Sequence, residues 1–229
     1  MIIGRKQEQS DLLRLIEEPE SQFCAVYGRR RIGKTFLIRE TFAHRFAFQH
    51  TGLAKAAKKE QLAEFKESLR AAGMRANKTP KDWYEAFHML ADHLTSQPAG
   101  KKVIFLDELS WMDTPKSGFI SALEHFCNGW AAARAEKDIV LVVCGSATSW
   151  IIDKIIRNRG GLHNRVTEQI SLSPFTLAEC EQYSQMRGLQ LTRRQIAELY
   201  MVFGGVPYYW HFLQRGDSPA QSVDSLLFD

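Results

Sequence analysis

Gly28-Arg29-Arg30-Arg31-Ile32-Gly33-Lys34-Thr35 is the clearest motif in this 229-residue sequence. It matches the pattern G-x-x-x-x-G-K-[ST] of a phosphate-binding loop. The short apolar run 23–27 before the loop predicts a buried strand, and residues 36–40 after it predict the opening of a helix. Strand, glycine loop and helix in this order are the context that the motif requires.

The chemistry of the loop follows from its backbone and two side chains. Gly28 and Gly33 allow the backbone to curl without Cβ clashes, so that its N–H groups form an anion-binding nest. A helix that begins near Lys34 adds positive partial charge at the same place. We expect Lys34 to contact the β- and γ-phosphates of a nucleotide, and the Thr35 hydroxyl to bind Mg²⁺. The expected nucleotide contacts are Gly28, Arg29, Arg30, Arg31, Ile32, Gly33, Lys34, Thr35 and Phe36, with the three arginines on the outer curve and pointing away.

Composition places the chain among soluble globular proteins. Apolar residues make up 45% of it and charged residues 24%, and the net charge is +4. Such a charge permits a nucleic-acid partner without arguing for one. The four cysteines have neither C-x-x-C nor zinc-site spacing, which favours reduced thiols in the cytoplasm. Because no stretch is long and apolar enough to cross a bilayer, we expect no membrane partner.

Three further apolar runs, at 46–50, 103–106 and 139–143, predict strands. The last two are continuous rather than alternating, which favours a parallel sheet that helices cover on both faces. The helices between the strands are expected at 58–70, from Thr79 with Pro80 in its first turn, at 119–130 and at 149–157.

The pattern changes near residue 166. Residues 166–172 alternate, which predicts a half-exposed strand, and the rest is helical from Pro174. Thr192 and Gln195 form a capping box that opens one helix, and Gly204-Gly205 ends it. Pro207 can occupy the first turn of the next helix. We therefore expect a core domain over 1–173 and a small helical lid over 174–229. Because the sequence stops in mid-element at 226–229, we also expect it to be part of a longer protein.

Two acidic residues and one serine follow predicted strands. Leu106-Asp107-Glu108 has the form of a Walker B motif, in which Asp107 would hold Mg²⁺ and Glu108 would orient and deprotonate the attacking water. A solvated acidic turn is the alternative. Ser146 ends the strand expected between those of the two Walker motifs, where it would bond to the γ-phosphate or the water. Helix capping by Ser146 or Thr148 is the alternative there.

Together these motifs resemble the prokaryotic AAA+-like ATPases called the archaeal ATPase family, relatives of the STAND NTPases. The resemblance covers nearly the whole chain, and its last two elements are more specific than the Walker motifs. The matching elements, in chain order, are Gly28-Arg-Arg-Arg-Ile-Gly-Lys-Thr35, Leu106-Asp-Glu, Gly145-Ser146, Asn164-Arg165-x-Thr167 with Leu172-x-Pro174-Phe175, and Gly204-Gly-Val-Pro-Tyr-Tyr209.

The resemblance implies an α/β P-loop NTPase core of the ASCE, AAA+-like type, with a parallel sheet in the order 5-1-4-3-2 and a helical lid. It implies that Ile3 and Arg5 lie near the adenine and that Pro207 packs close to the base. Many members carry a further C-terminal domain that resembles restriction-type nucleases, and nothing in this sequence matches that domain.

AAA+ relatives often complete their site with an arginine finger from a neighbouring subunit. Arg157, Arg159 and Arg165 lie in the interval where such residues occur, and Arg165 belongs to the Arg-x-Thr element. We therefore expect Arg165 to contact the γ-phosphate, in cis or in trans within a homo-oligomer. A solvated surface arginine is the alternative for each of the three.

The sequence thus predicts an enzyme that hydrolyses ATP to ADP with Mg²⁺, coupled to DNA or a partner protein. Its expected catalytic residues are Lys34, Glu108, Ser146 and Arg165. Two other functions stay open: a STAND-like switch that hydrolyses slowly, and a small-molecule kinase. The adjacent Asp107-Glu108 pair and a lid built on Gly-Gly-Val-Pro disfavour the kinase.

Overall fold

A five-stranded parallel sheet forms the core in this computed structural model, which describes residues 2–158, 160–162 and 164–228. The strands lie in the order β2-β3-β4-β1-β5, and every neighbouring pair is parallel. Their bounds are β1 (Gln22–Tyr27), β2 (Phe48–Thr51), β3 (Lys102–Asp107), β4 (Ile139–Gly145) and β5 (Glu168–Ser171). The expected strand order is confirmed, and the carboxyl ends of the strands meet at one end of the sheet.

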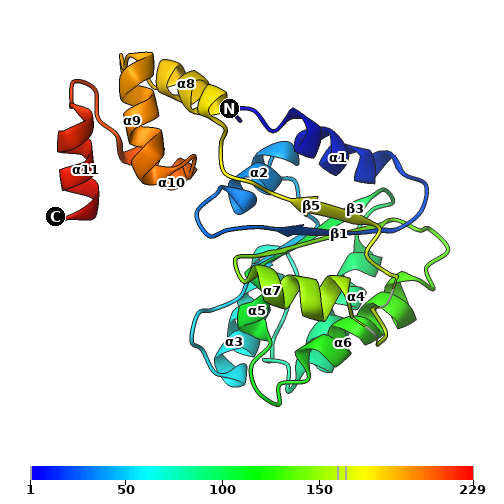
Figure 1. Cartoon of the computed structure of the whole chain (residues 1–229). Coiled ribbons are helices and arrows are strands. Elements are labelled where there is room, and N and C mark those ends of the chain that lie inside the picture. The colour runs from blue at the N-terminus through cyan, green and yellow to red at the C-terminus, as the bar shows by residue number, and fades with distance from the viewer. Residues whose placement is uncertain (1, 159, 163, 229) are drawn as a thin grey trace.

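Helices cover both faces of the sheet (Figure 1). The layer on one face is α1 (Lys6–Glu17) and α2 (Lys34–Thr41), and the layer on the other includes α3 (Lys58–Ala71), α4 (Trp83–Ser96) and α6 (Phe119–His125). Alternate residues of β1 serve the two layers, since Cys24 and Val26 pack with α1 and α2, whereas Phe23 and Ala25 pack with the opposite layer. Burial on both faces explains why the strand sequences are continuously apolar.

The helix expected from Thr79 begins later than predicted. α4 starts at Trp83, and the Asp82 carboxylate accepts a hydrogen bond from the Glu85 backbone N–H at 2.8 Å. Asp82 is therefore the N-cap, and Thr79 with Pro80 belongs to the preceding loop. An aspartate caps a helix at least as well as a threonine, so the nearer Asp82 takes that position.

Two predicted helices continue as π-helix. α6 passes into η1 (Phe126–Ala131), and α7 (Thr148–Ile151) passes into η2 (Ile152–Ile156). The spans 119–130 and 149–157 are thus helical as expected, but their apolar periodicity gave no sign of the wider turns. Segments of π-helix are uncommon and occur often at functional sites. One short helix, α5 (Leu109–Met112), follows β3 directly and was not predicted.

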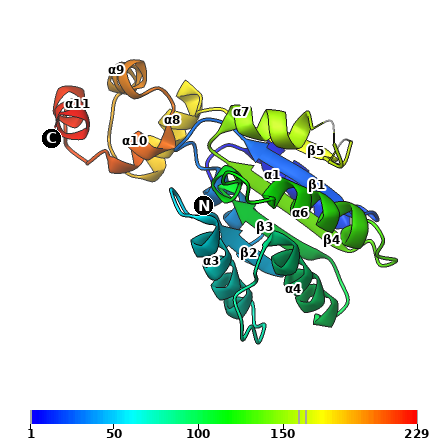
Figure 2. The same ribbon diagram turned by 90° about the horizontal axis from the view of Figure 1, so that it is seen from below.

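The remaining helices form a layer of their own beside one end of the sheet (Figure 2). They are α8 (Leu177–Met186), α9 (Arg193–Phe203), α10 (Pro207–Phe212) and α11 (Pro219–Leu227). Residues between Phe175 and Leu213 form a hydrophobic cluster separate from those of the sheet, and Ile3 packs against it. We call these helices the lid. The boundary at Ser173 stays a prediction, and the separate cluster supports it.

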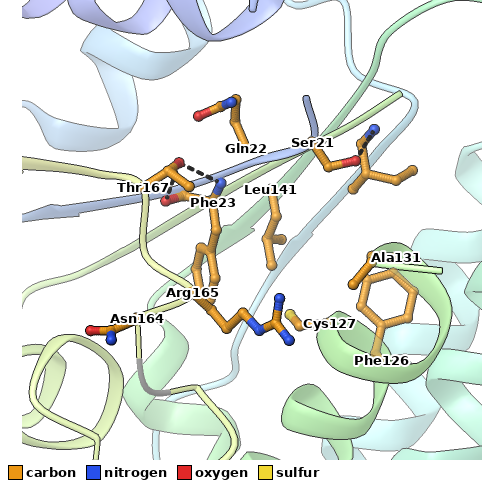
Figure 3. A pocket seen from close by; sticks show the side chains of 12 residues that line it. Ser21, Gln22, Phe23, Phe126, Cys127, Ala131, Leu141, Asn164, Arg165 and Thr167 are labelled. Atoms are coloured by element: carbon orange, nitrogen blue, oxygen red, sulfur yellow. Dashed lines mark hydrogen bonds between the residues drawn. The ribbon is translucent and has the colours of Figure 1, made fainter. Parts of the chain in front are cut away.

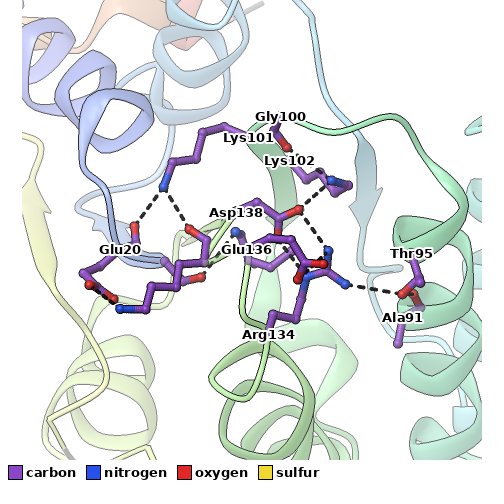
Figure 4. A network of polar contacts seen from close by, with 12 residues as sticks. Glu20, Ala91, Thr95, Gly100, Lys101, Lys102, Arg134, Glu136 and Asp138 are labelled. Atoms are coloured by element: carbon purple, nitrogen blue, oxygen red, sulfur yellow. Dashed lines mark hydrogen bonds and ion pairs between the residues drawn. The ribbon is translucent and has the colours of Figure 1, made fainter.

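A buried ionic network joins the amino ends of β3 and β4 (Figure 4). The Asp138 carboxylate accepts hydrogen bonds from Lys102 Nζ at 2.6 Å and from Arg134 Nε at 2.7 Å. Burial works to raise the pKa of Asp138, but the hydrogen bonds from Arg134 and Lys102 outweigh it and hold the pKa at about 2. This network lies at the opposite end of the strands from the phosphate loop. Among the described residues, no helix is long and apolar enough to cross a membrane.

Candidate nucleotide-binding site

A cavity of about 880 Å³ lies between the carboxyl ends of the strands and the lid. Ligands of open parallel sheets bind at this end, outside the carboxyl termini of the strands. Three parts of the chain line it, namely the N-terminal segment, the phosphate loop with the ends of β3 and β4, and the lid. The predicted residues on its wall are Ile3, Arg5, Arg30, Arg31, Ile32, Gly33, Lys34, Thr35, Phe36, Glu108, Ser146 and Pro207.

The curl of the phosphate loop depends on its two motif glycines. Gly28 has φ +143° and lies so close to the chain before the lid that a Cβ would overlap the carbonyl oxygen of Leu172. Gly33 is left-handed at φ +87° and forms the N-cap of α2. The first glycine is therefore required by space and the second by backbone conformation.

Lys34 is buried within the loop. Its Nζ donates hydrogen bonds to the carbonyl oxygens of Gly28 and Arg29, both at 3.0 Å. Burial lowers the pKa of Lys34 below its usual value, and the negative charges of Glu108 and Asp107 oppose that effect. The ammonium group is thus held at the centre of the loop by backbone oxygens. Gly28 and Arg29 contribute to the site through these carbonyl oxygens, which position the Lys34 ammonium group.

Asp107 and Thr35 bring two oxygen ligands together. The Thr35 hydroxyl donates to Asp107 Oδ2 at 2.8 Å, while Asp107 Oδ1 accepts from the Glu108 backbone N–H at 2.8 Å and from Cys144 Sγ at 2.7 Å. A hydroxyl and a carboxylate are the hard oxygen donors that Mg²⁺ prefers, and Mg²⁺ takes few protein ligands because it keeps several waters. The pair therefore fits the predicted magnesium site.

Glu108 and Ser146 are hydrogen-bonded to each other. Glu108 Oε2 accepts from the Ser146 backbone N–H at 3.1 Å and from its hydroxyl at 3.0 Å. The contact arises because β4 lies between β1 and β3, as the sequence predicted. Ser146 does not cap α7, since Ala147 occupies the N-cap and Thr148 is the first helical residue. Glu108 has φ +47°, a left-handed conformation that is rare outside glycine and is often found at functional residues.

The N-terminal segment joins the sheet to the lid. The Arg5 guanidinium donates to the carbonyl oxygen of Ser173 and lies 5.3 Å from the centroid of the Phe175 ring. Gly4 is left-handed, and a Cβ there would overlap the Glu179 carboxylate of α8. Ile3 and Arg5 line the cavity, and their place near an adenine stays a prediction; the Arg5 guanidinium already has partners within the protein.

The lid supplies cavity residues beyond the predicted Pro207. Arg187 Nη1 donates to the carbonyl oxygen of His211 at 2.9 Å and lies 3.2 Å from its Nδ1, while the Tyr183 hydroxyl lies 3.4 Å from the same nitrogen. These three polar side chains line the cavity together with apolar ones at Met186, Tyr208 and Phe212. Tyr183 is one helical turn from Arg187, and Tyr208 is one turn from Phe212. Tyr208 also belongs to the Gly204–Tyr209 element of the family resemblance.

Arg31 does not point away from the site as expected. Its guanidinium carbon lies 4.1 Å from the centroid of the Tyr208 ring in α10, and both residues line the cavity. The left-handed backbone at Arg31, with φ +68°, belongs to the same curl of the loop. The direction of this side chain depends on the lid, which the loop motif alone does not describe.

Arg165 lies elsewhere. It lines a small cavity of about 150 Å³ at the amino ends of β1 and β4, next to Phe23, Cys127 and Leu141 (Figure 3). The length of β1, about 17 Å for six residues, separates that end from the phosphate loop. The expected γ-phosphate contact in cis is therefore not made, and a contact in trans stays a prediction. Arg157 is exposed, and Arg159 lies outside the described residues.

The comparisons with known proteins agree with this geometry. A family model described as "ATPase domain predominantly from Archaea" matches residues 3–212. The chain is 23% identical over 235 residues to the uncharacterized protein MJECL04 of Methanocaldococcus jannaschii, a match that covers 99% of this chain and 48% of that relative. The chain thus spans about half the length of this curated relative.

Three solved structures share the fold. The Walker-type ATPase PABY2304 of Pyrococcus abyssi aligns with a TM-score of 0.68 and 16% identity, covering 98% of this chain and 71% of that one. The Aeropyrum pernix ORC2 protein, in ADPNP–ADP complexes, aligns with a TM-score of 0.63 and 15% identity, covering 98% and 61%. A STAND protein with a tetratricopeptide repeat sensor, PH0952 from Pyrococcus horikoshii, aligns with a TM-score of 0.56 and 20% identity, covering 100% and 33%.

Proposed function

The chain belongs to the family of ATPase domains found predominantly in Archaea, and we propose that it binds Mg-ATP in the 880 Å³ cavity. There it would hydrolyse the bond between the β- and γ-phosphates, releasing ADP and phosphate. The observation that carries this proposal is that Glu108 and Ser146 lie on the same cavity wall as Lys34 and Thr35. A base, a small polar group, a phosphate-binding cation and a metal-binding hydroxyl are the groups that in-line attack of water needs. The ORC2 protein, which shares this fold, was solved with ADPNP and ADP.

Each side chain has a separate task in this mechanism. Lys34 binds the β- and γ-phosphates and stabilises the negative charge that develops between them. Glu108 orients the attacking water and accepts its proton, and Ser146 holds the Glu108 carboxylate through two hydrogen bonds. Thr35 and Asp107 would hold Mg²⁺, which neutralises phosphate charge when it is bound. The lid residues and Ile3 enclose the base end of the nucleotide.

Steady-state phosphate release by the purified protein tests this proposal, with Glu108→Gln as the matched variant. The substitution keeps the shape of the side chain and an oxygen that can accept from Ser146, but it removes the base. We expect turnover to fall at least ~100-fold while Mg-ATP affinity stays near that of the wild type. Wild-type turnover by Glu108→Gln would show that another group is the base.

A slow nucleotide switch is the second candidate, and the contacts between loop and lid favour it. Arg31 of the phosphate loop lies on Tyr208 of α10, and Arg5 lies over the ring of Phe175, which belongs to the hydrophobic cluster of the lid, so the lid contacts both the loop and the N-terminal segment. A switch would retain nucleotide through purification and release phosphate far more slowly than the common enzyme range of 1–10³ s⁻¹. Nucleotide analysis of the purified protein, together with turnover in the absence of any acceptor, separates switch, ATPase and kinase.

We further propose that turnover is coupled to DNA, a partner protein or a second copy of the chain. The net charge of +4 is compatible with a DNA partner. Phosphate release measured with and without double-stranded DNA tests coupling to DNA. Phosphate release measured over a range of protein concentrations tests coupling to a second copy of the chain. A rate that changes in neither titration would leave only coupling to a different protein.

A further inference from the structure

The two oxygens of the Asp107 carboxylate have different partners. Oδ2 accepts from the Thr35 hydroxyl at 2.8 Å, on the side of the phosphate loop. Oδ1 accepts from the Glu108 backbone N–H at 2.8 Å and from the Cys144 thiol at 2.7 Å. An ionised carboxylate only accepts hydrogen bonds, so the thiol is the donor in the last of these contacts. The side chain is therefore fixed through one oxygen and presents the other toward Thr35.

Cys144 is placed for this contact by the register of the sheet. Leu106 of β3 pairs with Val143 of β4, which brings the next residues on the two strands, Asp107 and Cys144, side by side at the carboxyl end. Cys144 is completely buried and packs with the layer of α1 and α2. A thiol tolerates such an apolar environment better than a hydroxyl and still has a proton to donate.

We propose that Cys144 is a positioning residue for the magnesium site, an inference that rests on the proposed ATPase function. Its S–H group holds Asp107 Oδ1, which prevents the carboxylate from rotating and keeps Oδ2 directed toward Thr35. Without this donor, Oδ1 retains only the Glu108 amide, and the carboxylate gains freedom that metal binding must remove. The expected consequence is weaker metal binding with unchanged binding of the nucleotide itself.

Cys24 provides the matched control. It lies on β1, the neighbour of β4, is completely buried, and packs with the same layer of helices as Cys144. It precedes the carboxyl end of its strand by three residues, and no side-chain hydrogen bond of Cys24 occurs within the described part of the chain. Truncation of Cys24 thus costs similar packing without touching Asp107.

The experiment measures binding of Mn²⁺, as a spectroscopic substitute for Mg²⁺, to the complex of protein and ADPNP by electron paramagnetic resonance. We expect Cys144→Ala to weaken Mn²⁺ about fivefold, the scale of one net hydrogen bond. Cys144→Ser, which keeps a donor, should stay within about twofold of wild type on that scale, as should Cys24→Ala. Metal-free ADPNP affinity, measured by calorimetry, should be the same in all four proteins.

Two outcomes overturn the inference: Mn²⁺ affinity of Cys144→Ala equal to wild type, or an equal loss in Cys24→Ala. If Cys144→Ala does not fold, Cys144→Val fills the space without a donor and replaces it in the comparison with Cys144→Ser. Failure of the wild-type protein to bind ADPNP at all would instead contradict the proposed function. The two failures are therefore distinguishable.

Discussion

The guanidinium of Arg31 lies over the ring of Tyr208, with 4.1 Å between the guanidinium carbon and the ring centroid. A residue of the phosphate loop thus contacts the lid across more than 170 residues of sequence. Cation–π pairs contribute about 0.5–1 kcal/mol at exposed sites and more when they are desolvated. The pair is therefore strong enough to bias the position of the lid without locking it.

The first prediction concerns this pair. Tyr208→Ala and Arg31→Ala should each increase amide hydrogen exchange in α10, because either change removes the contact that holds the helix to the loop. The double variant should exchange no faster than either single one, since the interaction is already lost. Tyr208→Phe keeps the ring and should behave as wild type. Additive effects of the two alanine substitutions would show that the residues act independently.

The second prediction concerns Lys34. Its Nζ is held inside the loop by two carbonyl oxygens, and the side chain is buried on the cavity wall. Lys34→Ala should weaken ATP binding by about 2–3 kcal/mol, the value of a charge-assisted hydrogen bond to phosphate. Isothermal titration checks this, with Arg45→Ala as a control that removes one exposed positive charge elsewhere. Unchanged ATP affinity in Lys34→Ala would contradict the assignment of the loop.

The third prediction concerns Arg165. Because it lies at the amino ends of β1 and β4, it can reach a γ-phosphate only in another copy of the chain. We expect Arg165→Ala to lose at least ~30-fold in turnover, but only at concentrations where copies associate, and to keep its ADP affinity. Mixing Arg165→Ala with Glu108→Gln protein should then restore activity. Full turnover by Arg165→Ala at every concentration would make it an ordinary surface arginine.

The fourth prediction concerns pH. Burial lowers the pKa of His50 to about 4, and its Nδ1 is hydrogen-bonded to Ser68 Oγ at 2.9 Å. The unfolded chain takes up this proton near pH 6.5 and the folded chain does not, so stability falls as the pH drops from 6.5 toward 4. Between pH 7.5 and pH 5 the loss from this group should be about 2 kcal/mol.

Urea unfolding at pH 7.5 and pH 5 measures this loss. His50→Gln should be less stable at pH 7.5 but should show a smaller difference between the two pH values. His88→Gln, which changes an exposed histidine, should keep the wild-type difference. An equal pH dependence in His50→Gln and wild type would show that His50 is protonated in the folded protein.

The sequence predicted the part of the cavity around the glycine loop better than the part that the lid forms. The phosphate loop, Asp107 and Glu108 act through local backbone geometry and strand ends, so a short motif contains nearly everything that positions them. Tyr183, Arg187 and His211 meet only through the packing of α8 against α10, which no local pattern encodes. The Cys144–Asp107 contact is a matter of strand register, which sequence spacing does not fix.

The same distinction holds for the fold. Continuous apolar runs predicted the buried strands, and the family resemblance supplied their order. The start of α4 at Trp83 was missed because Asp82 competes with Thr79 for the cap, and the turns of η1 and η2 were missed because their burial pattern resembles that of an α-helix. Helix ends depend on single hydrogen bonds, whereas the strands depend on many apolar residues together.

The cavity wall combines residues from both ends of the chain, so the cavity can be completed only late in synthesis. Its wall includes Ile2 from the start of the chain and Phe212 from near its end. Contacts so distant in sequence form late, and a ribosome adds about 5–20 residues per second. A nascent chain that has passed Ser173 already contains every residue of the phosphate loop, of both strand ends and of the N-terminal segment, but none of the lid residues of the cavity wall. At about 5 residues per second, the ribosome needs roughly 8 s more to add the residues up to Phe212, which complete the wall of the cavity.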